Sequence, residues 1–413
     1  MNQSERRLVI FAAGGVVILV FLLLIARQIL HAAPPSVLDV TNAVFEPQPQ
    51  QPALPDLPSL DERQTESPSL AQPVDSTVTN AATIHRQAFA LYDALSKDEK
   101  AILTDWRTNV DAAVEAALCE KIRPICNLMH QATALTNCEW GVEPLTYDTK
   151  LPHLSPARAI ARAAVWSAAH CRANDTTAAT DDLLSALQLG RSVSHTAIIG
   201  CLVDLSIQGV AWSYVETHLD SFQKAAGQRL LVAFSDAFYE EEPSVAMEQT
   251  AGVSDRLVAK LASLPADEFD NQISEYHSLY SSEPLPKMDR TAVLTSLQQV
   301  ADTEHDLARV LGSGSWDEYQ NWAQRQIELE NSNPLVKEFL GAYDNFVNRV
   351  QREAVTREMM VAALAVAQDG PTALQSYPDP STGQPFDYTE TADGFELQST
   401  YKTNGVPLKM QFK

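Results

Sequence analysis

The segment SPARAIARAAVWSAAHCRANDTTAATDDLLSALQLG, residues 155–190, decides the fold, because its pattern is that of two helices joined by a tight turn. Pro156 suits the first position of a helix. Residues 157–173 contain eight alanines, whose small side chains let neighbouring helices approach closely. Residues 174–177 (NDTT) supply turn and capping side chains, and a second helix then extends to Leu189. The sequence therefore predicts an α-helical hairpin near the centre of the chain.

Helical periodicity continues on both sides of this hairpin, from Ala81 to about Gln368. Ser96 and Glu99 form a capping box, from which we expect a helix to run as far as Ile122, and Pro124 is expected to restart a short helix. Further helices are predicted over residues 82–95, 124–137, 198–219, 222–239, 245–264, 267–279, 290–311, 316–330 and 334–368. The helical body is thus an array or bundle of about ten helices.

The period changes after residues 369–371 (DGP). Residues 385–390 and 394–400 alternate in polarity around a turn, and residues 406–412 could add a third strand. The fold class is therefore mainly α, with a small antiparallel β-element at the C-terminus. This sheet needs the helical body to cover one face, since a lone hairpin is marginal in water.

An uncharged apolar run of nineteen residues, Leu8–Ala26 (LVIFAAGGVVILVFLLLIA), precedes all of this. As a helix it spans about 28 Å, close to the thickness of a bilayer core. Arg6 and Arg7 stand before it, which favours a cytoplasmic N-terminus. His31 is too large for a cleavage site at residues 31–33 (HAA), so we expect an uncleaved anchor.

A proline-rich spacer separates the anchor from the helical body. Residues 34–80 hold nine of the twenty-three prolines, seven acidic residues and no glycine, so the segment should be a disordered, semi-rigid spacer. A proline-rich docking ligand is the alternative. The expected division is 1–7 cytoplasmic stub, 8–27 transmembrane anchor, 28–80 linker, 81–370 α-helical domain and 371–413 C-terminal β-hairpin segment.

The charge of the chain limits its partners. Thirty basic and fifty-three acidic residues give a net charge of −23, which argues against nucleic acid and against adhesion to an anionic membrane surface. The predicted partners are the lipid bilayer, through residues 8–26, and an unknown protein. We expect a single-pass protein of the cytoplasmic membrane, with its N-terminus inside and its body in the periplasm or outside the cell.

Five cysteines are few for a disulfide scaffold and odd in number, and none form a C-x-x-C motif. We take Pro124 to break the helix between Cys119 and Cys126, and Cys138 ends the next segment. The sequence therefore predicts at least one disulfide among these three cysteines. Cys171 and Cys201 fit equally well as small buried apolar residues.

Three charged residues, Asp182, Glu304 and Arg357, fall on stripes that are otherwise apolar. A charge on such a stripe must pair, lose its charge or face a cavity. One interpretation is structural pairing, with Glu304 as the partner of Arg357. The other is a polar pocket inside the helical body, in which Glu304 acts as a base or a ligand.

The sequence offers no recognisable catalytic motif. G-x-S-x-G, H-E-x-x-H, P-loop and G-x-G-x-x-G patterns are all missing from it. Zinc-capable residues occur near the ends of three consecutive helices, but without the spacing of a known site: His170, Cys171, His195 and Cys201. We therefore assign no catalytic, cofactor-binding or metal-ligating residue and expect no cofactor.

Several short motifs resemble an uncharacterised family of bacterial envelope proteins with one N-terminal anchor and an α-helical body. They are residues 151–154 (LPHL), 190–191 (GR), 379–386 (DPSTGQPF) and 393–395 (DGF). The resemblance extends over about residues 90–400 and implies the location and the helical fold. That family has no established activity to carry over.

Two weaker likenesses concern parts of the chain. Ala179, Leu183 and Ala186 with Ser167 resemble one tetratricopeptide-type helix pair, but no second unit follows at the repeat spacing, so we expect a hairpin and not a solenoid. The C-terminal β-segment is similar to the carboxyl end of type II secretion pseudopilins. The anchor differs from theirs, because no Gly-Phe junction precedes Leu8.

These features predict a non-enzymatic interaction or scaffold module of the bacterial envelope. One alternative is an envelope hydrolase with an unrecognised carboxylate site that involves Glu304. Another is an accessory protein of a secretion or pilus-like apparatus. A pocket that holds Glu304 beside a second acid or a histidine would favour the enzyme.

Overall fold

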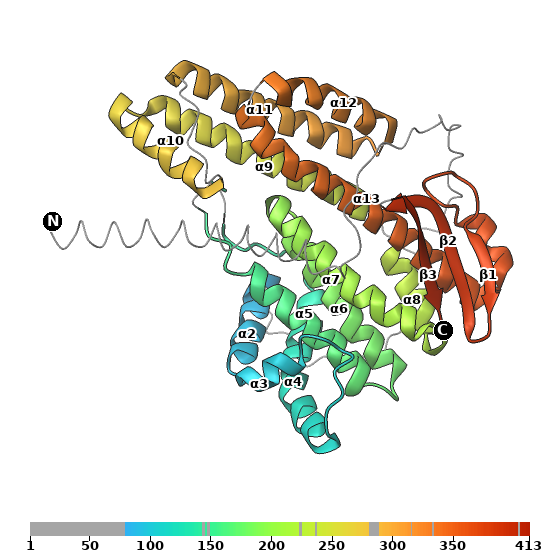
Figure 1. Ribbon diagram of the computed structural model, residues 1–413. Coiled ribbons are helices and arrows are strands. Elements are labelled where there is room, and N and C mark those ends of the chain that lie inside the picture. The colour runs from blue at the N-terminus through green and yellow to red at the C-terminus, as the bar shows by residue number, and fades with distance from the viewer. Residues whose placement is uncertain are drawn as a thin grey trace.

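The computed structural model describes residues 79–142, 145–146, 149–222, 225–235, 238–280, 289–314, 316–332, 334–403 and 405–413. Over these residues the protein is mainly helical and ends in a three-stranded antiparallel sheet, which confirms the predicted fold class (Figure 1). The predicted anchor at 8–26 lies outside the described residues, as does the predicted spacer up to residue 78.

The first three helices of the body are α2 (Ala81–Asp93), α3 (Lys97–Ile102) and α4 (Ala112–Thr133). The capping box of Ser96 and Glu99 opens α3 as predicted. The helix ends at Ile102, however, and α4 starts afresh behind the N-cap Asp111.

Pro124 lies inside α4 and does not begin a new helix. A proline inside a helix costs about 3 kcal/mol. The buried stripe of Leu118, Ile122, Ile125 and Met129 continues straight across it, and α4 packs against α2, α5 and α6. We attribute the unbroken helix to this packing.

The unbroken helix changes the cysteine pairing. Cys119 and Cys126 are seven positions apart on one straight helix, about 10 Å along its axis, whereas a disulfide needs Cα atoms within about 7 Å. The predicted bond among Cys119, Cys126 and Cys138 is therefore wrong, since Cys126 and Cys138 are free thiols. Cys119 is bonded instead to Cys171 at the end of the next helix, with a Cα–Cα distance of 5.5 Å.

The central hairpin consists of α5 (Leu154–His170) and α6 (Thr176–Ser194), and α7 (Ala197–Thr217) packs against both. The Asp175 carboxylate accepts a hydrogen bond from the Ala178 N–H and caps α6. A Cβ atom built on Gly190 of α6 would lie 2.0 Å from Oδ1 of Asp204 on α7, so this position needs glycine. The predicted α-helical hairpin is thus a close-packed element of the core.

Helix α7 is long and apolar enough to cross a membrane, by length and composition alone, and no other helix in the described part of the chain is. In this fold 67% of its most apolar window is buried inside the protein. Its apolar character is therefore accounted for by its place in the helical core.

The later helices are α8 (Ala225–Phe234), α9 (Phe238–Ser263), α10 (Ala266–Tyr280), α11 (Arg290–Gly312), α12 (Trp316–Ser332) and α13 (Pro334–Asp369). Helices α9 and α11 lie side by side along most of their lengths (Figure 1). Helix α13 runs from this group to the sheet, and its end, Met359–Val366, is buried on all sides as its all-round apolar sequence predicts.

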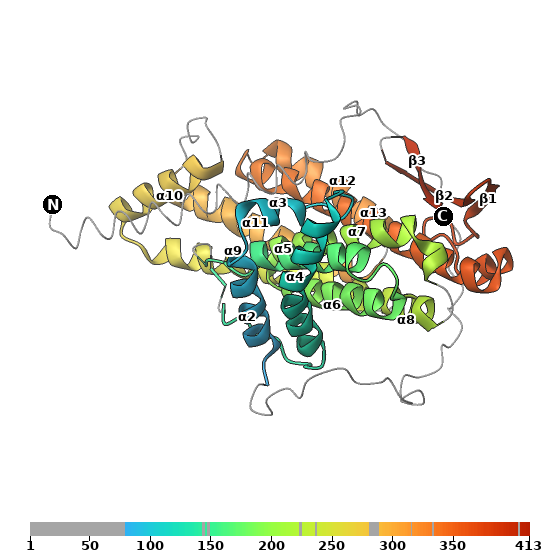
Figure 2. The same ribbon diagram turned by 90° about the horizontal axis from the view of Figure 1, so that it is seen from below.

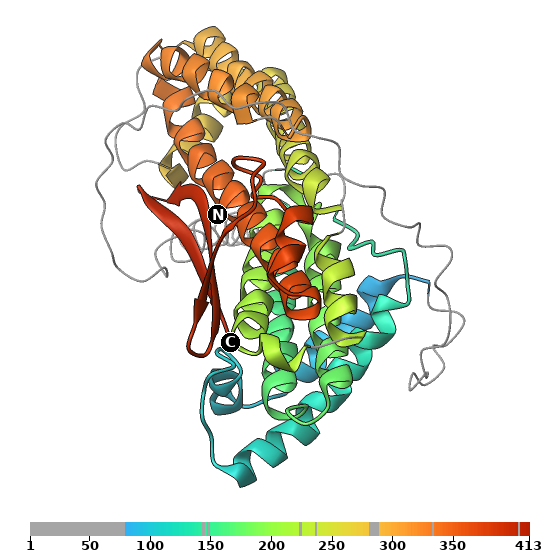
Figure 3. The same cartoon turned by 90° about the vertical axis from the view of Figure 1, so that its right-hand side faces the viewer.

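Strands β1 (Asp387–Thr391), β2 (Gly394–Thr403) and β3 (Val406–Phe412) form the sheet in the order β1-β2-β3. Within the described part of the chain, two short 3-10 helices are η2 (Leu219–Ser221) and η3 (Pro371–Ser376). Figure 2 shows the sheet at the opposite end of the molecule from α10, and Figure 3 shows it beside α13. Leu397, Met410 and Phe412 belong to the same buried cluster as the end of α13, so the helical body covers one face of the sheet.

The DPSTGQPF segment has a structural role in this end of the fold. The Asp379 side chain is buried, and its carboxylate accepts hydrogen bonds from the Ser399 hydroxyl at 2.8 Å and the Thr400 N–H at 2.9 Å. It also accepts from the N–H of Ser381 at 2.8 Å. This one carboxylate therefore joins the loop to strand β2.

Candidate functional site

The three charged residues singled out in the sequence lie in separate parts of the helical body. Asp182 is on α6, Glu304 on α11 and Arg357 on α13, and they are 0%, 1% and 7% exposed. Glu304 and Arg357 do not pair. The hydroxyl of Tyr343 on α13 donates to Glu304, while Nη2 of Arg357 lies 3.1 Å from the carboxylate of Glu358. Tyr343 and Arg357 are about 21 Å apart along α13, so the same helix face cannot bring both to Glu304.

Asp182 is compensated by two nitrogen-bearing side chains. Nε2 of His130 on α4 lies 2.8 Å from one carboxylate oxygen, and Nε of Arg172 lies 3.8 Å from the other. Cys126 is one turn from His130, and burial, followed by the charge of Asp182, raises the pKa of its thiol well above the usual value. The thiolate is the reactive form of cysteine. This cluster therefore contains the cysteine, histidine and aspartate of a nucleophilic triad, but the raised pKa of the Cys126 thiol disfavours the reactive thiolate.

Glu304 is held between α11, α9 and α13. Burial raises the pKa of its carboxyl group to about 7, although hydrogen bonds with the hydroxyls of Ser254 and Tyr343 favour the charged form. The nearby charge of Asp255 also raises this pKa, and that of His305 lowers it. Burial therefore favours the protonated form of this carboxyl group.

His305, the next residue along α11, bridges two carboxylates on α9. Its Nδ1 lies 3.0 Å from Glu248 and its Nε2 lies 2.9 Å from Asp255. The hydrogen bond to Asp255 raises the pKa of His305 against the opposing effect of partial burial, and Glu248 adds to the increase. The imidazolium form of His305 is thus stabilised by acids on both of its nitrogen atoms.

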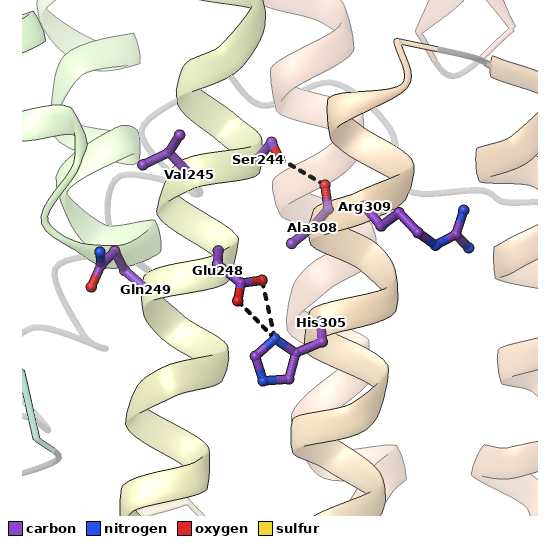
Figure 4. Close-up of a pocket in the computed structure, with 7 residues that line it drawn as sticks. All are labelled: Ser244, Val245, Glu248, Gln249, His305, Ala308 and Arg309. Carbon is purple, nitrogen blue, oxygen red and sulfur yellow. Dashed lines mark hydrogen bonds and ion pairs between the residues drawn. The ribbon is translucent and has the colours of Figure 1, made fainter.

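A pocket of about 310 Å³ opens beside this ion pair, between α9 and α11 (Figure 4). Its lining residues are Ser244, Val245, Glu248, Gln249, His305, Ala308 and Arg309. The Ser244 hydroxyl donates a hydrogen bond to the carbonyl of Ala308 at 2.8 Å. Arg309 also has acidic partners, since its guanidinium lies 2.6 Å from Asp306 and 3.8 Å from Glu318.

The pocket can bind polar groups, but its lining does not form a reaction centre. The buried acid Glu304 is not among its lining residues. The one hydroxyl nucleophile of the lining, Ser244, is hydrogen-bonded to a backbone carbonyl and not to a base. What the pocket presents to solvent is an ion pair, an amide and an arginine.

The zinc-capable residues of the sequence are not assembled into a site. Cys171 is in the disulfide, and Nε2 of His170 is hydrogen-bonded to the carbonyl of Trp106 at 2.8 Å. Across the described residues, no group of three or more His, Cys, Asp or Glu side chains is placed to hold a metal ion.

The sequence interpretation found Glu304 but missed Asp255, His305 and Tyr343, which interact with it, and Glu248, which pairs with His305. In the sequence, Glu248, Asp255 and His305 look like ordinary solvent-facing polar residues. Only the packing of α9 on α11 brings them together. Comparison with protein families, curated proteins and solved structures found no match for this chain.

Proposed function

We propose that this protein is a non-enzymatic interaction module of the bacterial envelope, in which the pocket between α9 and α11 binds a polar group of a partner protein. The observation that carries the proposal is the pairing of the charges in the pocket. His305 is held between two carboxylates, and Arg309 lies between Asp306 and Glu318. Such a surface offers donors and acceptors for recognition without an activated nucleophile or base.

The proposed location is outside the cytoplasm, with the chain anchored through residues 8–26 and its N-terminus inside. The apolar run and the two arginines before it support this orientation. The bond between Cys119 and Cys171 supports it independently, because structural disulfides persist in oxidising compartments. The net charge of −23 supports a partner that is not nucleic acid.

Site-specific photo-crosslinking in cells tests the module. A photoreactive residue replaces Gln249 at the pocket in one variant and Glu120, an exposed residue on α4, in another. We expect a discrete crosslinked protein from position 249 and not from 120, which mass spectrometry then identifies. Adding Glu248→Gln should weaken that crosslink. Identical products at both positions would contradict a specific pocket.

The topology has its own test. A reporter enzyme that is active only outside the cytoplasm, fused after Lys413, should be active in the full-length protein. Activity of a cytoplasmic reporter alone at the same position would overturn the proposed location.

A hydrolase remains the second candidate, on the strength of Glu304, whose pKa of about 7 suits a general acid or base. Its burial at 1% exposure and its bond from Tyr343 count against this role. Turnover of an envelope substrate that is lost in Glu304→Gln but retained in Glu120→Gln would support the enzyme. Accessory function in a secretion apparatus is supported only if the C-terminal sheet pairs with strands of another protein.

A further inference from the structure

His305 joins α11 to α9 through three side chains, and we call Glu248, His305 and Asp255 the histidine bridge. Nδ1 of the imidazole lies 3.0 Å from the Glu248 carboxylate, and Nε2 lies 2.9 Å from that of Asp255. The two acids are seven positions apart on α9, so they project from the same face of the helix, two turns apart. One imidazole ring therefore ties α11 to two turns of α9.

The histidine bridge is complete only when His305 is positively charged. An imidazolium ring carries an N–H on both nitrogen atoms, whereas a neutral ring carries one N–H and one lone pair. With a carboxylate at each nitrogen, the neutral ring leaves one carboxylate facing a lone pair, which repels it. Loss of one proton from His305 therefore breaks one of the two contacts.

The contact with Glu248 is the one that breaks. The hydrogen bond to Asp255 is the largest cause of the raised pKa of His305, so the remaining N–H stays on Nε2. The Glu248 side chain is also the more exposed of the two acids, at 58% against 44%, and can leave with less disturbance to the packing. Glu248 is among the lining residues of the pocket and Asp255 is not (Figure 4). A released Glu248 carboxylate is thus already at the pocket.

The basic side chains of α11 and α12 in this region are held by other acids. Arg309, one turn after His305, lies 2.6 Å from Asp306 and 3.8 Å from Glu318 on α12. Arg325 on α12 lies 3.0 Å from Asp306 as well. Because Arg309 already has two acidic partners, it competes only weakly for a carboxylate that His305 releases.

The other charged or titratable groups around His305 belong to α9, α11 and α13. Glu304 precedes it and accepts a hydrogen bond from the Tyr343 hydroxyl of α13. Asp302, one turn before His305, is exposed and bonded to a glutamine of its own helix. Arg256 on α9 donates to a backbone carbonyl of the loop before α5. Of these groups Glu304, with a pKa of about 7, titrates close to His305, so a test must separate the two residues.

We propose that the histidine bridge is a pH-operated latch, which holds Glu248 while His305 is an imidazolium and releases it to the partner once His305 is neutral. Like the proposed function on which it rests, the latch concerns the pocket between α9 and α11, and it adds how binding there is regulated. A released carboxylate is an acceptor, so the partner group that gains is a cationic donor, an ammonium or a guanidinium. Binding therefore strengthens as the pH rises, by up to about tenfold per pH unit until His305 has lost its proton.

Nuclear magnetic resonance of the full-length protein with carbon-13-labelled histidine, in phosphatidylcholine nanodiscs, measures the titration of His305. The resonance that is missing in His305→Gln identifies it among the nine histidines. Its pKa should lie above 6.5 and fall in both Glu248→Gln and Asp255→Asn, because each variant removes an acid from one nitrogen atom. Glu120→Gln, an exposed acid paired on α4, is the matched control and should leave this pKa unchanged. A pKa at or below 6.5, or one that neither variant changes, overturns the latch.

Photo-crosslinking from position 249 in isolated membranes, at pH 6, 7, 8 and 9, measures the regulation. The yield of the crosslinked partner should rise with pH when the histidine bridge is intact. In Asp255→Asn the rise should begin at a lower pH, because His305 loses its proton more easily. In His305→Gln the yield should not depend on pH. Glu304→Gln should keep the rise, which separates the latch from the titration of Glu304.

The possible outcomes distinguish failure of the latch from failure of the binding module. A crosslink of equal yield at every pH overturns the latch and leaves the module standing. A rise that persists in His305→Gln, or disappears in Glu304→Gln, assigns the regulation to another group and also overturns the latch. A crosslink that is absent at every pH overturns the module, and the latch with it.

Discussion

Replacing Glu304 with glutamine should change how the stability of the protein depends on pH. Glutamine keeps the shape of the side chain and can still accept the hydrogen bond from Tyr343, but it does not titrate. In the wild type, burial raises the pKa of Glu304 from 4.5 to about 7. Folding therefore favours the protonated form, and this contribution to stability is complete below pH 4.5 and is lost as the pH rises through about 7.

The size of the effect follows from the two pKa values. One unit of difference corresponds to about 1.4 kcal/mol, so the whole contribution is ~3 kcal/mol, and ~2.5 kcal/mol of it is lost between pH 5 and pH 8. Little is screened by solvent, because the side chain is 1% exposed. Glu304→Gln should accordingly be more stable than the wild type at pH 8 and lose this advantage at pH 5.

Urea unfolding of the full-length protein in one detergent, followed by tryptophan fluorescence at pH 5, 6, 7 and 8, measures this difference. Trp322 is buried in the same cluster as Tyr343 and reports on this region. Glu120→Gln, an exposed carboxylate on α4, controls for the loss of a surface charge and should parallel the wild type at every pH. Equal pH slopes for Glu304→Gln and the wild type would refute the reasoning.

Three further predictions concern the frame of the molecule. Peptide mapping without reduction should show Cys119 bonded to Cys171, and a bond within one helix would contradict this. Replacing both cysteines with alanine should lower the free energy of unfolding by up to about 4 kcal/mol, because the unfolded chain is then no longer constrained by a closed loop of 52 residues. Gly190→Ala should destabilise the fold by about 2 kcal/mol, because the added Cβ meets the buried Asp204. Gly209→Ala should stabilise the fold by up to about 1 kcal/mol, because its added Cβ meets nothing within 4 Å. Urea unfolding compares the two variants, and equal effects would show that the clash at Gly190 is relieved. Limited proteolysis should cut within residues 34–80 and release a fragment that begins near Ala81, as read by mass spectrometry, and an uncut spacer would contradict its expected disorder.

Local features of the sequence predicted most of the helices and all three strands. The capping box at Ser96 opens a helix, and the turn before Gly394 joins two strands, because both signals depend only on neighbouring residues. The same local reasoning failed at Pro124. A proline normally ends a helix, but there the packing of the buried stripe on both sides of it is decisive, and that packing is a tertiary property.

The pairings within the fold could not be predicted in the same way. The apolar stripe indicated that Glu304 is inside, but which residue faces it depends on how α13 is aligned with α11, and the alignment selects Tyr343. Likewise, His305 meets Glu248 and Asp255 only because α9 and α11 lie side by side. Sequence periodicity predicts which face of a helix is buried, and it does not predict the register between two helices.

The buried charges of this protein differ in how each is compensated. Asp182 has His130 and Arg172 beside it. Glu304 can take up a proton, and its raised pKa shows that burial favours this form.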